Sequence, residues 1–343
     1  MEAAHARFRH QPGRAHARPG RCGLVPRSFP GCRDPGSRSF SRLRPLRIAP
    51  QTLSLRDALI AIAITAVWGS NFVVIHVGLE QLPPLLFAAL RFTFALIPAV
   101  LFIKRPAVPW RNLAAYGVFV GAGQFGLLYT AMSGYITPGL ASLVVQTQVF
   151  FTILLAGVLN GERLRVFQVI ALLLALAGIL IILRHTDATT TALGLALVLA
   201  AAAGWAASNM VVRATPGVDM LGFVVWASFF SAVPLFAMSY LFEGWPAIST
   251  GLANATAATW GAVAWQSTGN TLFGYAAWSA LLARYPVATI APMTLLVPIF
   301  GMGASALALG EPLHDWKLVA ACFVMSGLAL NVLWPRLRKV LAG

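Results

Sequence analysis

Ten separate apolar runs, each about long enough to cross a lipid bilayer, fill the chain from Asp57 to Trp334 and constrain its fold more than any other feature. A hydrocarbon core of about 30 Å is spanned by about 20 helical residues. The composition agrees, since 58% of the residues are hydrophobic and 10% are charged, with a mean hydropathy of +0.76. The sequence therefore predicts a membrane protein that crosses the bilayer many times.

Short polar segments separate the runs and place the expected spans to within a few residues. The runs are continuously apolar over about 20 residues instead of alternating over about ten, so we expect helices and not barrel strands. The predicted fold class is an all-α membrane protein with ten transmembrane helices. The expected spans are Asp57–Val77, Pro84–Ile103, Asn112–Met132, Pro138–Leu159, Val166–Leu183, Thr191–Val211, Leu221–Leu241, Thr256–Leu282, Pro286–Leu309 and Trp316–Trp334.

The orientation follows from the positions of lysine and arginine. If the chain starts on the inside, the outer connections carry only Arg184 and Lys317. This asymmetry obeys the positive-inside rule, so we expect both termini in the cytoplasm. The inner connections and the C-terminus carry Lys104, Arg105, Arg111, Arg163, Arg165, Arg213, Arg284, Arg336, Arg338 and Lys339.

The formal charge of +15 and the pI of about 11.1 are explained by this topology together with a basic N-terminal segment. A protein that binds nucleic acid would need a soluble domain to present its basic patch, and the sequence offers none. We therefore expect a lipid bilayer and a small solute as partners, and no nucleic acid. The pattern does not indicate an oligomeric state.

Residues 1–51 differ in composition from the rest of the chain. They hold eleven arginines, no lysine and many Pro, Gly and Ser, so we expect disorder. Three interpretations stay open: a tail that touches anionic lipid, an organelle transit peptide, or translated upstream sequence ahead of a start near Leu53. We favour the third, because the membrane core begins at once after this point.

Short motifs recur in the same order in the two halves of the chain. We therefore expect two five-helix repeats, residues 52–184 and residues 185–340. Because five is odd, the second repeat would enter the membrane upside down, as in the inverted repeats of secondary transporters. The matched pairs are 70–74 with 208–212, Pro98 with Pro234, Tyr129 with Tyr275, and 161–164 with 310–313.

These residues also carry a family resemblance over essentially the whole of 53–340. The motifs are VWGSNFVVI around Trp68, LRF around Arg91, TPGLASLV from Thr137, QVFFTILLAG from Gln148, GERL from Gly161 and RYPVATIAPMTLLVPIFGM from Arg284. In this set the chain resembles the EamA branch of the drug/metabolite transporter superfamily, and most of all the O-acetylserine/cysteine exporter branch. It departs from the family in GEPL at 310–313, which lacks the arginine of the first copy, and in residues 1–51.

The resemblance implies ten spans and export of small amino-acid metabolites, such as O-acetylserine or cysteine, across the bacterial inner (plasma) membrane by alternating access. One alternative is a drug/metabolite transporter for another class of small solute. A membrane-embedded lipid-modifying enzyme is a further alternative. That enzyme would need a catalytic constellation, and the sequence shows no HExxH motif, no paired intramembrane carboxylates and no Ser/His/Asp set.

Polar side chains inside the spans are the candidates for a solute site, because unpaired polar groups in hydrocarbon cost several kcal/mol. Amides with aromatic walls suit a zwitterion or another small polar solute. Alternatively, they hydrogen-bond across helix interfaces and touch no ligand. The candidates are the pairs Trp68 with Asn71, Ser142 with Gln146, Trp205 with Asn209 and Gln266 with Asn270, each on one helical face, together with Gln124 and Gln148.

Arg91 is the formally charged residue that lies well inside a span, about 10 Å below its outer end at 1.5 Å per residue. It could hold a substrate carboxylate by two parallel hydrogen bonds. Alternatively, it caps backbone carbonyls or pairs with an outer acid such as Glu80. Its partners in the fold decide between these hypotheses.

Neither catalysis nor metal binding is predicted. Cys22 and Cys32 lie in the N-terminal segment and Cys322 lies in the last span, so they form no cluster, and we expect no cofactor. All ten acidic residues fall in the N-terminal segment, at span ends or in connections, which favours a facilitator or an exchanger over a carboxylate proton relay.

Overall fold

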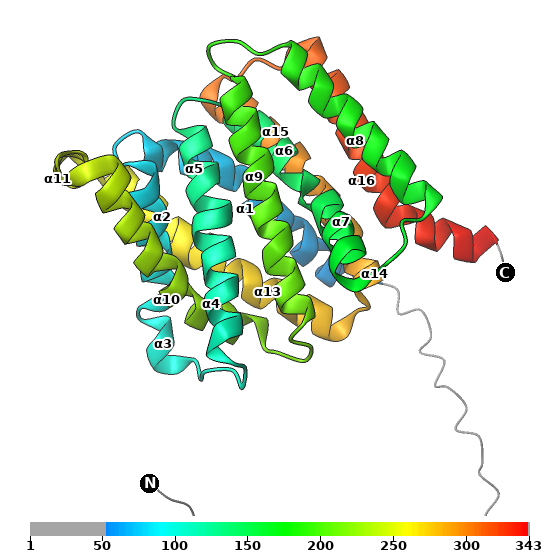
Figure 1. The fold of residues 1–343 in the computed structure, drawn as a ribbon, viewed down its shortest axis with the longest axis horizontal. Helices are drawn as coiled ribbons and strands as arrows, with labels where there is room; N and C mark the ends of the chain where they lie inside the picture. The colour runs from blue at the N-terminus through cyan, green and yellow to red at the C-terminus, as the bar shows by residue number, and fades with distance from the viewer. Residues whose placement is uncertain (1–52, 342–343) are drawn as a thin grey trace, which may run out of the picture. The chain divides into compact units, whose positions relative to one another are not determined.

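The computed structural model describes residues 53–341, which contain helices and no strands (Figure 1). The all-helical prediction is confirmed. The interpretations of residues 1–51 fall outside the described residues.

Most of the described residues lie in α-helices, interrupted by five helices of other types. The α-helices are α1 Leu55–Leu79, α2 Pro84–Leu96, α3 Ala99–Phe102, α4 Trp110–Val118, α5 Leu127–Met132, α6 Pro138–Val144, α7 Gln148–Asn160, α8 Val166–Arg184, α9 Ala192–Arg213, α10 Met220–Met238, α11 Gly244–Asn254, α12 Ala257–Ala264, α13 Gly274–Arg284, α14 Val287–Ile290, α15 Leu296–Leu309 and α16 Asp315–Leu341. The others are the π-helices η1 Phe119–Gly126, η3 Ser239–Glu243 and η4 Trp265–Phe273, and the 3₁₀ helices η2 Val145–Thr147 and η5 Ala291–Leu295.

Nine helical stretches within residues 53–341 are long and apolar enough to cross a membrane. They correspond to nine of the ten expected runs. The remaining run, Thr256–Leu282, is also continuous helix from α12 through η4 to α13, but its middle carries Gln266, Ser267, Asn270 and Thr271. The predicted count of ten spans therefore stays a prediction.

Local chemistry explains where several helices begin and end. Proline occupies the first turn of α2 and of α6, where its missing N–H needs no partner. The α7 and α15 helices both end in a glycine with left-handed backbone, Gly161 at φ 68° and Gly310 at φ 66°. This conformation suits glycine because it has no Cβ.

The two halves share their irregular segments as well as their sequence motifs. The third and eighth runs each contain a long π-helix, η1 and η4, and the fourth and ninth runs each contain a 3₁₀ helix, η2 and η5. A π-helix changes which side chains share a face, and such segments often mark functional sites. The same distortion at the same place in each half agrees with an internal duplication.

Three spans pack antiparallel to their counterparts in the other half. The α2 and α10 pair is joined where the Glu243 carboxylate, just beyond α10, accepts hydrogen bonds from the N–H groups of Leu85 and Leu86 at the start of α2. Glu311, just beyond α15, likewise accepts a bond from the Gly139 N–H at the start of α6. Counterpart spans of an inverted repeat run in opposite directions, so these antiparallel pairs agree with one.

The third pair is formed by α8 and α16, which lie side by side in Figure 1. Rings meet at both ends of this pair: His185 stacks on Trp316 with centroids 5.0 Å apart, and Phe167 lies tilted against Trp334 at 6.4 Å. The remaining spans interleave between the halves, since α1 packs on α15 and η4, while α9 packs on η1 and α7. Groups from both halves therefore meet in the middle of the bundle.

The two Gly-Glu turns, Gly161-Glu162 after α7 and Gly310-Glu311 after α15, lie at opposite ends of the bundle. This arrangement gives a topology prediction. The continuous helical stretch Pro138–Asn160, from α6 through α7, has 23 residues, so its two ends lie about 34 Å apart at 1.5 Å per residue. Arg163→Cys and Pro312→Cys, both at exposed positions, should therefore react with a membrane-impermeant thiol reagent from opposite sides. Labelling of both from the same side would contradict the inverted topology.

Close packing of α1 against α15 gives a second prediction. A Cβ at Gly69 would lie 2.5 Å from Phe300 Cβ and 2.6 Å from the Val297 carbonyl oxygen. Gly69→Ala should lower the free energy of unfolding by about 1–3 kcal/mol, because the helices would have to separate. Gly303→Ala is the matched control, since a Cβ there meets nothing within 4 Å. Thermal unfolding in detergent measures both, and equal melting temperatures would contradict the prediction.

Candidate functional site

Arg91 on α2 is buried in the middle of the bundle, with 1% of its surface exposed. Its Nη1 donates to the Tyr129 hydroxyl and its Nη2 to Thr271 Oγ1, both at 3.1 Å. The guanidinium also lies 3.6 Å from the centre of the Phe125 ring. The site is therefore a buried cation held by two hydroxyls and an aromatic face, from α2, η1, α5 and η4.

The charge of Arg91 has no counter-ion among residues 53–341, where the ion pairs involve other arginines and one lysine. The alternative pairing with Glu80 is thus wrong, because the donors are directed to Tyr129 and Thr271. Arg91 Nε is buried without a hydrogen-bond partner. A buried cation with a free donor is unfavourable unless an anion joins it.

Asn71 and Gln266 form a reciprocal amide pair next to this site. Gln266 Nε2 donates to Asn71 Oδ1 at 2.8 Å, and Asn71 Nδ2 donates to Gln266 Oε1 at 3.3 Å. Both residues are buried. The pair joins α1 to η4 across the interface between the halves, so its first role is to hold two helices together.

Trp68 and Asn270 meet on the same two helices. Trp68 Nε1 donates to the Asn270 carbonyl oxygen at 3.3 Å, and the indole packs against Tyr275 and Trp278 with ring centroids 6.2 and 5.2 Å away. The buried Asn270 Oδ1 accepts no hydrogen bond. Asn270 thus offers an unused acceptor, and it immediately precedes in the chain Thr271, which binds Arg91.

A second amide cluster lies between α7 and α9. Asn209 Nδ2 donates to Gln148 Oε1 at 2.9 Å and approaches Thr152 Oγ1 at 3.4 Å. These three side chains are half-buried. Asn71 and Asn209 occupy matching places in the repeat, but the first pairs with a glutamine of the eighth run and the second with a glutamine of the fourth.

The four remaining candidates differ in environment. Ser142 donates to the Gly139 carbonyl on its own helix and contacts Gly301 of α15, an environment that favours a packing role. Trp205 is half-buried against the main apolar core. Gln124 and Gln146 are 5% and 6% exposed, and neither forms a side-chain hydrogen bond within the described residues.

Several residues of the site were not among the sequence candidates. Tyr129, Thr271 and Phe125 surround Arg91, yet each is an ordinary core residue by composition. A signal existed for Tyr129, which recurs as Tyr275 in the second half. Nothing in the sequence marks Phe125 or Thr271, because their role depends on how π-helices η1 and η4 turn their side chains.

Comparison with known proteins supports the repeat and settles the family. The EamA-like transporter family matches the chain twice, over residues 56–184 and 192–333. This chain belongs to the EamA-like transporter family. It is a multi-pass membrane transporter, and the hypothesis of a membrane-embedded enzyme is set aside on that ground.

Two curated relatives align with this chain over nearly their whole length. A protein of Salmonella typhimurium named probable amino-acid metabolite efflux pump is 37% identical over 84% of this chain and 98% of its own. A protein of the same name from Escherichia coli K12 is 36% identical with the same coverage. A solved crystal structure with 21% identity and a TM-score of 0.54, covering 82% of this chain and 97% of its own, shares the fold.

The amide pair gives a prediction that separates packing from binding. Asn71→Ala leaves the buried Gln266 amide unpaired and should lower the free energy of unfolding by about 1–3 kcal/mol. Asn71→Ala combined with Gln266→Leu should recover part of that loss, because no unpaired polar group remains. Asn209→Ala, at a half-buried position, should destabilise less. If Asn71→Ala lowers transport per folded molecule while the thermal midpoint stays unchanged, Asn71 contacts the solute instead.

Proposed function

We propose that this transporter exports small amino-acid metabolites, with O-acetylserine and cysteine as the first candidates. The site would bind the solute carboxylate at Arg91. The single observation that supports this most is the buried Arg91 guanidinium, which has a free Nε and no carboxylate partner among the described residues. A solute carboxylate would supply the missing charge through charge-assisted hydrogen bonds.

The chemistry around Arg91 also suits the other end of an amino acid. The unused Asn270 Oδ1 is an acceptor one residue away from Thr271, which already binds Arg91. An ammonium group is a donor without acceptor capacity, so it would satisfy that oxygen. A zwitterion thus complements Arg91 Nε and Asn270 Oδ1 together, whereas a sugar or an organic cation would leave the Arg91 charge uncompensated.

Names of relatives point to the same class of solute. Besides the two efflux pumps, a protein of Streptantibioticus cattleyicolor named probable terminal-alkyne amino-acid exporter is 26% identical over 81% of this chain and 94% of its own. An amino-acid skeleton is common to these names. The carboxylate, which all such solutes share, is the group that Arg91 would recognise.

The proposal includes location and mechanism. We place the protein in the bacterial inner membrane with both termini in the cytoplasm, as the basic inner connections favour. Transport would follow alternating access between two inverted repeats, 52–184 and 185–340. The antiparallel pairs α2 with α10, α6 with α15 and α8 with α16 support this arrangement.

Arg91→Lys tests the proposed carboxylate site. Lysine keeps the charge but loses the planar two-point geometry of the guanidinium, so we expect transport to fall about tenfold or more. Cells that overproduce the wild-type protein should release more O-acetylserine or cysteine and tolerate more of either. At equal amounts of folded protein, the variant should lose most of both effects.

Arg105→Lys is the matched control, because Arg105 is an exposed arginine that packs on Trp110 outside the site. It should leave release unchanged. Full release by Arg91→Lys would overturn the assignment of Arg91. If no amino-acid derivative is released above background but aromatic cations or sugars are, the substrate class is wrong and only the family assignment stands.

A further inference from the structure

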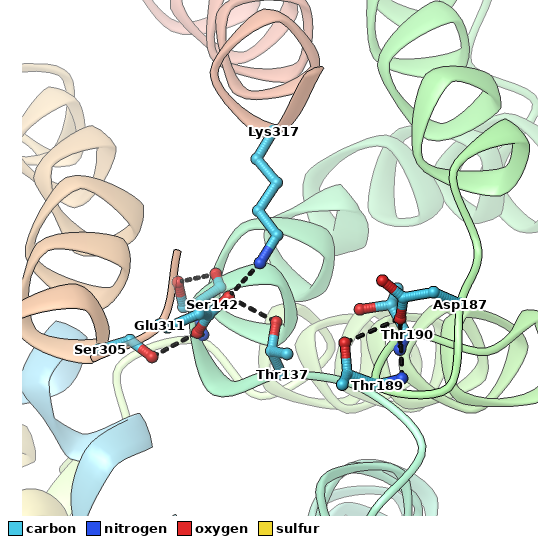
Figure 2. A network of polar contacts seen from close by, with 9 residues as sticks. Thr137, Ser142, Asp187, Thr189, Thr190, Ser305, Glu311 and Lys317 are labelled. Atoms are coloured by element: carbon cyan, nitrogen blue, oxygen red, sulfur yellow. Dashed lines mark hydrogen bonds and ion pairs between the residues drawn. The ribbon is translucent and has the colours of Figure 1, made fainter. Parts of the chain in front are cut away.

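Beyond the central site, a buried polar cluster lies at the end of the bundle where α15 ends (Figure 2). Its centre is Glu311, whose side chain is 6% exposed and pairs with Lys317, 5% exposed, at 2.9 Å. A buried ion pair is usually a poor way to gain stability, because both ions lose their hydration. Its presence here calls for a functional reason.

The Glu311 carboxylate binds groups from both halves of the chain. Oε1 accepts hydrogen bonds from Thr137 Oγ1 at 2.5 Å and from Lys317 Nζ at 2.9 Å. Oε2 accepts from the Gly139 N–H at 2.9 Å and from the Ser305 hydroxyl. Thr137 and Gly139 open the fourth span in the first half, so this carboxylate ties the two halves together at this end.

The protonation state of Glu311 agrees with this role. Burial raises the pKa of the carboxyl group, but hydrogen bonds from Ser305, Thr137, Lys317 and Gly139 outweigh burial and hold the pKa below its ordinary value. The carboxylate is thus ionised at neutral pH. A lowered pKa contributes stability above the unfolded pKa, and this contribution is lost as the pH falls through the folded value.

The other end of the bundle carries the matching turn in a different state. Gly161 and Gly310 have the same left-handed conformation and each is followed by glutamate, so Glu162 and Glu311 leave their helices in the same way. Glu162, however, is 48% exposed and pairs with Arg213, itself 54% exposed. Equivalent acids are thus buried between the halves at one end and solvated at the other.

We propose that the two Gly-Glu turns close opposite ends of the bundle in alternate states of the transport cycle. Each turn acts as a latch for its own end. Glu311 holds its end of the bundle shut in this structure. When that end opens, Glu162 takes the equivalent position at the start of the ninth span, near Pro286, and shuts the other end. The inference rests on alternating access as proposed above, but it does not depend on which solute is carried.

Gly139 supplies a way to disturb the latch without removing its charge. A Cβ at this position would lie 2.8 Å from Glu311 Oε2, the end of a flexible side chain. Gly139→Ala should therefore displace the carboxylate and leave the helix intact. Glu311→Gln is the complementary change, since it keeps the shape and removes the charge.

The test is accessibility of the bundle interior in vesicles, with Gln146→Cys as the reporter in a chain whose other cysteines are replaced. Gln146 is buried midway along the fourth span. Labelling by an impermeant thiol reagent from the side that also labels Pro312→Cys should rise about tenfold or more with Glu311→Gln, because charge-assisted bonds are lost. Gly139→Ala should change it in the same direction. Glu162→Gln should lower it.

Asp187→Asn is the matched control at the same end. Asp187 binds Thr189 and Thr190 within its own loop and does not tie the halves together (Figure 2). It should leave labelling unchanged. Unchanged labelling with both Glu311→Gln and Gly139→Ala, or an equal rise with Asp187→Asn or Glu162→Gln, would overturn the latch. If the unmodified protein exports no amino-acid metabolite while the variants show the expected labelling, only the proposed substrate is disproved.

Discussion

The cost of an unpaired polar group in hydrocarbon governs this structure. Every backbone group of a span must be bonded within its own helix, which forces the helical fold. The same cost explains why the buried amides of Asn71 and Gln266 face each other, and why Glu311 is surrounded by four donors. Against this background, the free Nε of Arg91 and the free Oδ1 of Asn270 are exceptions that a solute would resolve.

Duplication arranges these groups but does not make them equivalent. Both halves carry π-helical and 3₁₀ segments at matching places, and the fourth and ninth spans are both followed by Gly-Glu. Yet Arg91 has no basic counterpart in the seventh span, and Asn71 and Asn209 find different partners. The symmetric parts would allow two alternate states of the bundle, whereas the asymmetric parts would form the proposed solute site.

Part of the candidate site followed from sequence and part did not. Helical spacing predicts Trp68 with Asn71 on one face and Gln266 with Asn270 on another, and the tertiary structure brings these two pairs together. Gln148 and Asn209 also meet, but in a separate cluster. Ser142 hydrogen-bonds within its own helix and lies against Gly301. The surroundings of Arg91 could not be foreseen, because its hydrogen-bond partners Tyr129 and Thr271 lie 38 and 180 positions away in the chain.

The sequence alone determined the class of protein, its helical content, the internal duplication and the family, since apolar length and ordered motifs are local properties that the bilayer makes decisive. Only the tertiary structure decided which polar groups are satisfied. Contacts such as Gly139 with Glu311 and Arg91 with Thr271 join distant spans, and no local pattern encodes them. Tertiary contacts also decide that Glu311 is buried between the halves, whereas Glu162, which follows glycine in the same motif, is exposed to solvent.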